Sequence, residues 1–182
     1  KYDEKWAAVW ALRQAHKYLL ANEKKFPDFL PNKKSLGLLR VVFATIPQNY
    51  QWAMKLLGLH GDLKKGLQNI RQVIDTQGIY SLEARIYEVL LQVYILENNE
   101  LAVQNLIEIR KLENENLLLD FVNVMLFIKI KKSKEALQLL KEIPQSVHSK
   151  IPYLNYLRAE AELYHGNYKT AQRYYKAFLI DY

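Results

Sequence analysis

The stretch YHGNYKTAQRYYKAFL, from Tyr164 to Leu179, places Gly166, Tyr168 and Ala171 in the order G-x-Y-x-x-A. The chain of 182 residues has only 6 glycines, so a glycine at this point calls for a structural reason. Glycine readily adopts the left-handed backbone conformation that ends one helix and reverses the chain. A small alanine five residues later lets a second helix approach the first closely. The stretch therefore predicts the turn and the second helix of a helical hairpin.

Small residues recur along the chain at intervals of 34 to 36 residues, each opening an apolar helical run. Counting backward from Ala171, these anchor residues are Ala136, Ala102 and Gly66. The positions four and seven residues after each anchor lie on the same helix face and are all apolar or aromatic. They are Ile70, Val73, Leu106, Ile109, Leu140, Ile143, Tyr175 and Phe178. One hairpin cannot bury such a face alone, so successive hairpins are expected to stack.

The period and the G-x-Y-x-x-A order resemble the tetratricopeptide repeat (TPR) family. The last unit, Pro152 to Asp181, matches best, because Ala159 also occupies its first helix. The resemblance covers about residues 48–182 and implies an all-α, right-handed superhelical solenoid with about four helix-turn-helix hairpins. At the turn before Ala102, the family's glycine is absent, and we expect Asn98 or Asn99 to take the left-handed conformation instead.

The position twelve residues before each anchor is usually small in the family. Here it holds Met54, Leu90 and Val124 in three units, and alanine only in the last. Larger side chains hold paired helices apart. We therefore expect the first three hairpins to splay wider than the last.

The N-terminal third is less regular and is expected to form a divergent helical part over residues 1–47. Its first helix should end before Pro27. The distance from Ala15 to the anchor Gly66 is about half a repeat too long for one repeat. An extra helix before Pro47 accounts for this excess. Residues 27–61 also resemble the opening of uncharacterised Bacteroidota TPR proteins, which implies a bacterial protein and points to no particular activity. Both ends of the chain fall in helical patterns, so we expect a longer protein.

Composition indicates a soluble, helix-rich protein. Glycine and proline are scarce, with 6 and 5 residues, while 50% of residues are hydrophobic and 25% charged. The longest apolar stretch, Leu117 to Ile128, is too short to span a bilayer, so we expect no transmembrane segment and a location in the bacterial cell envelope or the cytoplasm. The net charge of +7 suits either simple solubility or an acidic partner such as nucleic acid, anionic lipid or an acidic peptide.

No pattern in the chain is typical of an enzyme. The four histidines are scattered and none occurs in H-E-x-x-H. Glycine-rich phosphate loops and G-x-S-x-G are missing from the sequence, which also has no cysteine. Asp62 is predicted to be a helix N-cap. We therefore expect a non-catalytic protein that needs no cofactor and no metal.

Aromatic residues are the candidate binding groups. Tyr80, Tyr87 and Tyr94 recur every seven residues and so form one stripe on a helix. In TPR proteins the first helices of the hairpins line a concave groove, and this resemblance implies an aromatic groove here. The binding residues that it implies are Tyr87, Tyr94, Phe121, Met125, Tyr153, Tyr156 and Tyr164. Tyrosine suits recognition because it offers a large area, little rotamer entropy and a polar tip.

Other interpretations of the same residues remain open. The stripe could instead pack between repeats. The positions that clamp a C-terminal carboxylate in chaperone-binding TPR proteins hold other residue types here, so we do not expect that ligand. We expect a scaffold that binds a protein or peptide. The alternatives are an RNA-binding, pentatricopeptide-like array, which the aromatic slots disfavour, and a self-assembling solenoid. The lysines at 129, 131, 132 and 134 favour a solvated turn over a binding patch.

Overall fold

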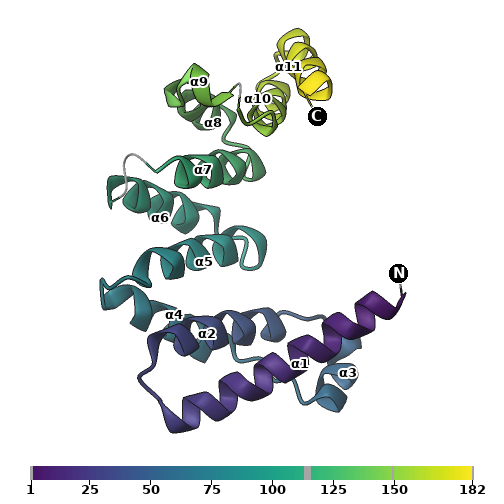
Figure 1. The fold of residues 1–182 in the computed structure, drawn as a ribbon, viewed down its shortest axis with the longest axis vertical. Helices are drawn as coiled ribbons and strands as arrows, with labels where there is room; N and C mark the ends of the chain where they lie inside the picture. Colours follow the sequence, from purple (N-terminus) through teal and green to yellow (C-terminus); the bar gives the residue numbers. More distant parts are fainter. Residues whose placement is uncertain (1, 113–115, 149, 182) are drawn as a thin grey trace. The chain divides into compact units, whose positions relative to one another are not determined.

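The computed structural model describes residues 2–112, 116–148 and 150–181, and within these ranges every regular element is a helix (Figure 1). The elements are α1 (Tyr2–Lys25), α2 (Leu30–Ala44), a 3-10 helix η1 (Gln48–Tyr50), α3 (Gln51–Leu57), α4 (Leu63–Asp75), α5 (Ser81–Tyr94), α6 (Asn99–Leu112), α7 (Leu117–Lys129), α8 (Ser133–Glu142), α9 (Gln145–His148), α10 (Tyr153–Tyr164) and α11 (Tyr168–Asp181). The predicted all-α class is confirmed.

The chain divides into two compact units, Lys1–Glu97 and Asn98–Tyr182. The sequence also predicts a boundary between residues 47 and 48, where a divergent helical part gives way to repeats. This boundary stays a prediction. Among the described residues, no helix combines the length and the apolar character needed to cross a bilayer.

In the first unit, α2 packs directly against α4. The two backbones touch where Gly37 meets Gly66: a Cβ atom on Gly66 would lie 2.7 Å from the carbonyl oxygen of Gly37. The small residue predicted at the Gly66 anchor is therefore a packing requirement. The helix that pairs with α4 is α2. The repeat spacing instead predicts that α4 pairs with the segment around Met54. That segment forms only η1 and the short α3, and Met54 packs with Phe43 and Leu59.

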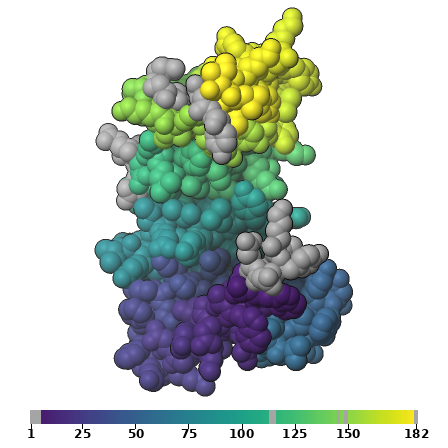
Figure 2. Space-filling model, turned by 45° about the vertical axis from the view of Figure 1, so that its right-hand side comes forward, coloured from purple at the N-terminus to yellow at the C-terminus, as the bar shows by residue number. Residues whose placement is uncertain are grey.

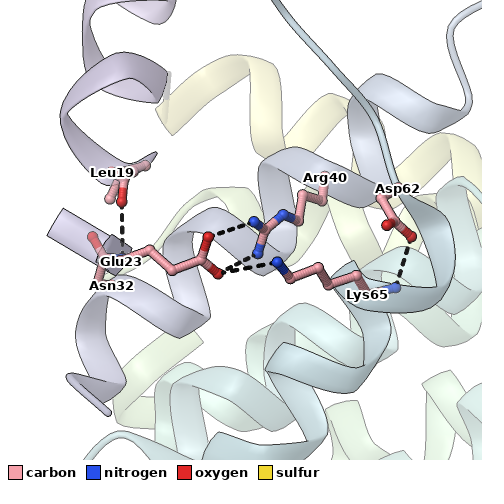
Figure 3. Close-up of polar contacts among 6 residues, drawn as sticks. All are labelled: Leu19, Glu23, Asn32, Arg40, Asp62 and Lys65. Carbon is pink, nitrogen blue, oxygen red and sulfur yellow. Dashed lines mark hydrogen bonds and ion pairs between the residues drawn. The ribbon is translucent and has the colours of Figure 1, made fainter. Parts of the chain in front are cut away.

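Polar contacts attach α1 to the rest of the first unit (Figure 3). The carboxylate of Glu23 accepts two hydrogen bonds from the buried guanidinium of Arg40, each 2.7 Å long, and its Oε1 lies 3.7 Å from Nζ of Lys65. Nδ2 of Asn32 donates to the carbonyl of Leu19 at 3.1 Å. The hydrogen-bonded Arg40 holds the pKa of the Glu23 carboxyl below its ordinary value.

The N-cap predicted at Asp62 is confirmed, since its Oδ1 accepts a 2.8 Å hydrogen bond from the backbone N–H of Lys65. The left-handed residue before α6 is Glu97, with φ of 53°, and not Asn98 or Asn99. Asn98 instead accepts the backbone N–H of Leu101 at 3.2 Å and so caps α6. The side chain of Asn98 therefore accepts a hydrogen bond at the exposed start of α6, and the preceding residue takes the left-handed conformation of the turn.

In the second unit, α7 pairs with α8, and α10 packs against α7, α8 and α11. Gly166 has φ of 88° and ends α10, so the glycine reversal predicted from the opening stretch is confirmed. The small residues Ala136, Ala159 and Ala171 are all buried. Of the eight apolar positions predicted to line the core, those on α4, α6 and α8 are buried, as is Ile143, while Tyr175 and Phe178 on α11 are half-buried.

Candidate functional site

The predicted binding residues fall in both units of the protein. Tyr87 and Tyr94 lie on α5 in the first unit, and the other five lie on α7 and α10 in the second. Their surroundings differ, because the second unit gathers aromatic rings, whereas the first unit gives Tyr87 charged neighbours.

Three predicted residues of the second unit form a continuous row of rings. Phe121 of α7 lies against Tyr153 of α10, with ring centroids 5.8 Å apart. Tyr153 in turn lies against Tyr156, at 5.0 Å. These separations are typical of favourable aromatic pairs. The structure therefore brings together three of the side chains that the sequence singled out.

Two further rings from α11 extend this row. The ring of Tyr156 lies 6.0 Å from that of Tyr175 and 5.5 Å from that of Phe178, which also meets the ring of Tyr153 edge-on. We call these five residues, Phe121, Tyr153, Tyr156, Tyr175 and Phe178, the aromatic cluster. Sequence reasoning assigned Tyr175 and Phe178 to the core. The sequence does hold one sign that these two residues belong to an aromatic cluster: they are large rings, whereas the equivalent positions of earlier hairpins hold smaller aliphatic residues.

The aromatic cluster is partly exposed to solvent. Tyr153 is exposed and the other four side chains are half-buried. Burial raises the pKa of the Tyr156 hydroxyl, and burial together with a hydrogen bond to Glu160 raises that of Tyr175. Tyr175 donates its hydroxyl to the Glu160 carboxylate. The result is a partly exposed, mostly apolar surface that carries three tyrosine hydroxyl groups, one of which is bonded to Glu160.

The two remaining predicted residues of this unit lie on the same helices. Met125 is half-buried, one turn along α7 from Phe121. Tyr164 is the last residue of α10 and is exposed. Methionine adapts its shape to irregular apolar ligands, so Met125 suits the border of a binding surface.

Tyr87 in the first unit has partners within the fold. Its hydroxyl donates a 2.5 Å hydrogen bond to Oε1 of Glu83. This bond is the main cause, and burial the second cause, of a pKa of Tyr87 that is raised to about 12. Glu83 also pairs with the buried Lys34 of α2. The Lys34 ammonium lies 5.4 Å and 5.6 Å from the ring centroids of Tyr80 and Tyr87. Tyr87 therefore helps to tie α5 to α2. Tyr94, two turns along α5, is exposed.

In the described part of the chain, no three histidine, aspartate or glutamate side chains gather as metal ligands would. No protein-family model matches the chain, and no curated protein or solved structure is significantly similar to it. The geometry of the aromatic cluster is therefore the basis on which a function is proposed.

Proposed function

We propose that this protein is a non-catalytic scaffold that holds a segment of a partner protein on the aromatic cluster of its second unit. In this proposal the hairpins are TPR-like repeats that stack into a right-handed solenoid. The first helices α7 and α10 present three of the binding residues, and the second helix α11 adds Tyr175 and Phe178. The observation that carries the proposal is the row of rings contributed by α7, α10 and α11.

The hairpin of α10 and α11 supports the TPR-like interpretation. Its turn contains a left-handed glycine, and small buried residues, Ala159 and Ala171, occupy its two helices. Such residues let paired helices approach closely, which fixes the first helix and the aromatic side chains that it carries. A rigid scaffold of this kind loses little entropy when a ligand binds.

The chemistry of the cluster favours a peptide with apolar or aromatic side chains. Binding energy at protein interfaces concentrates in a few aromatic anchors, each worth about 2 kcal/mol or more on truncation. The rings already constrain one another, so they offer apolar area at a small cost in side-chain entropy. The Glu160 carboxylate is engaged by Tyr175, which leaves the apolar surface as the main recognition element.

Selection of peptides from a displayed library on the immobilised chain tests the proposal. Selected peptides should bind Tyr153→Ala and Tyr156→Ala at least tenfold more weakly than the unaltered chain. Tyr168→Ala is the matched control, because Tyr168 is an exposed tyrosine of the same unit and lies outside the cluster. Each variant should be melted first, so that loss of fold is separated from loss of binding. A library that yields no binder, or binders that are indifferent to both cluster variants, would contradict the proposal.

A further inference from the structure

All three tryptophans of the chain are exposed. Trp6 and Trp10 of α1 are 63% and 57% exposed, and Trp52 of α3 is 69% exposed. Leu56, one turn after Trp52, is 77% exposed. Tryptophan is on average a largely buried residue, so three exposed copies on two helices of one unit indicate an interaction surface.

The helices that carry these residues lie side by side. Nε of Arg13 in α1 donates a 3.0 Å hydrogen bond to the carbonyl oxygen of Leu57 at the end of α3. A cleft of about 350 Å³ is lined by residues of α1 together with Leu57 and Gly58. Figure 1 places α3 next to α1, and Figure 2 shows the two helices, in purple and blue, next to each other on one face of the unit. The two helices that carry the exposed tryptophans are therefore neighbours in the first unit.

Basic side chains continue the tryptophan stripe along α1. Trp6, Trp10, Arg13, Lys17 and Lys24 follow one another at spacings of 4, 3, 4 and 7 residues, which keeps them on one side of a helix. The Arg13 guanidinium lies 5.3 Å from the centre of the Trp10 ring, a cation–π contact that joins the aromatic and basic parts of the stripe.

The charge of this region is mostly positive, although α1 also carries Asp3 and Glu4 before Trp6. Between residues 6 and 25 the only acidic residue is Glu23, and its carboxylate is paired with Arg40. Residues 48–60 contain Lys55 and no acidic residue. We call Trp6, Trp10, Arg13, Lys17, Lys24, Trp52, Lys55 and Leu56 the Trp–basic surface.

We propose that the Trp–basic surface docks on an anionic lipid bilayer. Tryptophan rings favour the headgroup level of a membrane, where an apolar ring and a polar N–H are both accommodated. Lysine and arginine close to the bilayer are attracted by its negative surface potential. An exposed leucine beside the rings gains from contact with the acyl boundary. The surface combines these three requirements on two neighbouring helices.

Two other occupants fit the surface less well. Single-stranded nucleic acid would use the charges and the rings, but an aliphatic side chain such as Leu56 has no π-face on which a base can stack. A second copy of the chain would bring like charges together, which opposes association. The bilayer is the occupant that uses both the charge and the aliphatic exposure. The inference does not depend on the proposed peptide site, because the Trp–basic surface belongs to the first unit.

Tryptophan fluorescence tests the inference directly, because every tryptophan of the chain lies on this surface. Vesicles of phosphatidylglycerol mixed with phosphatidylcholine should shift the emission to the blue, and brominated acyl chains should quench it. Vesicles of phosphatidylcholine alone should do neither. No shift with anionic vesicles at low salt would overturn the inference. So would a shift with poly-uridylate but not with vesicles, or a blue shift that grows with protein concentration in the absence of lipid.

Charge-matched variants separate this surface from general attraction. Lys17→Gln with Lys24→Gln should weaken co-sedimentation with anionic vesicles about 25-fold, at roughly fivefold per lysine. Lys169→Gln with Lys176→Gln removes the same charge from exposed positions on α11 and should have little effect. Trp10→Ala should weaken binding while the melting temperature stays unchanged. Equal weakening by the two lysine pairs, or full binding by Trp10→Ala, would overturn the assignment of the surface.

Discussion

Gly37 and Gly66 meet backbone to backbone where α2 crosses α4: a Cβ atom on Gly37 would lie 2.9 Å from the carbonyl oxygen of Gly66, and one on Gly66 would lie 2.7 Å from that of Gly37. Neither position admits a side chain without displacement of the other helix. The crossing buries Val41, Ile70 and Val73, which form the centre of the first unit. Two glycines thus set the distance between the two helices that support α1 and α5.

Gly66→Ala should therefore destabilise the protein by about 1–3 kcal/mol, because the added methyl group over-packs a backbone contact. Gly78→Ala is the control, since its Cβ atom would meet nothing closer than 3.6 Å and the backbone there needs no positive φ. That change should be neutral or slightly stabilising, because alanine has less freedom than glycine in the unfolded chain. Denaturant unfolding measures both. Equal midpoints for the two variants would contradict the close crossing.

Glu23 and Arg40 should make the stability of the first unit sensitive to acid. The folded-state pKa of Glu23 is lowered, chiefly by its hydrogen bonds from Arg40. Such a group stabilises the fold fully above its ordinary pKa of 4.5 and loses that contribution as the pH falls through the lowered value. Unfolding free energy should therefore decrease below about pH 4.5.

Glu23→Gln should cost about 1–3 kcal/mol at neutral pH, because the buried Arg40 loses a charged partner. The same variant should flatten the acid limb of the stability curve. Asp28→Asn is the control, since Asp28 pairs with Lys33 at an almost fully exposed position, and such pairs contribute little. If Asp28→Asn flattened the acid limb as much as Glu23→Gln, the pair of Glu23 and Arg40 would not be its source.

Tyr87 should contribute to stability through its hydroxyl group. Tyr87→Phe removes the hydrogen bond to the Glu83 carboxylate and should cost about 1.5–3 kcal/mol, the range for hydrogen bonds to charged groups. The raised folded-state pKa adds a second readout. The contribution of this hydroxyl is complete below the ordinary tyrosine pKa of 10 and is lost as the pH rises from 10 to about 12.

Tyr50→Phe supplies the comparison, because Tyr50 is an exposed tyrosine of the same unit and its loss should change stability by only a few tenths of a kcal/mol. Stability measured from pH 8 to 12 should decline less steeply for Tyr87→Phe than for the unaltered chain. Identical alkaline limbs would mean that Tyr87 ionises normally. A large loss of stability in Tyr87→Phe would show that Tyr87 has a structural role, and Tyr87 would then no longer be a candidate binding residue.

The parts of the fold that depend on local periodicity could be predicted from the sequence. The apolar residues four and seven positions after each anchor and the N-cap at Asp62 depend on neighbours within two helical turns. The reversal at Gly166 belongs to the same class, because only glycine takes positive φ at little cost.

Features that join distant segments could not be predicted in the same way. The spacing paired α4 with the segment around Met54, whereas the close backbone contact at Gly37 selects α2. Lys34 and Glu83 are 49 residues apart, and no periodicity relates them. Their ion pair nonetheless determines the surroundings of Tyr87. The candidate binding stripe stays a prediction, and the residue pattern gives no information on the partners that Tyr87 has within the fold.

The aromatic cluster should also couple α10 to α11 energetically. Tyr156 and Phe178 have ring centroids 5.5 Å apart, and such pairs contribute about 0.5–1.5 kcal/mol beyond the area that they bury. In a double-mutant cycle, Tyr156→Leu and Phe178→Leu should therefore show a coupling energy of that size in denaturant unfolding. Replacement by leucine keeps most of the apolar volume, so the cycle reports on the ring contact. Tyr156→Leu with Tyr168→Phe is the control cycle, because Tyr168 is exposed and outside the cluster, and its two changes should add. Additive effects in the first cycle would show that the two rings lie near one another without interacting. The cluster would then lack the rigidity on which its proposed role as a peptide-binding surface depends.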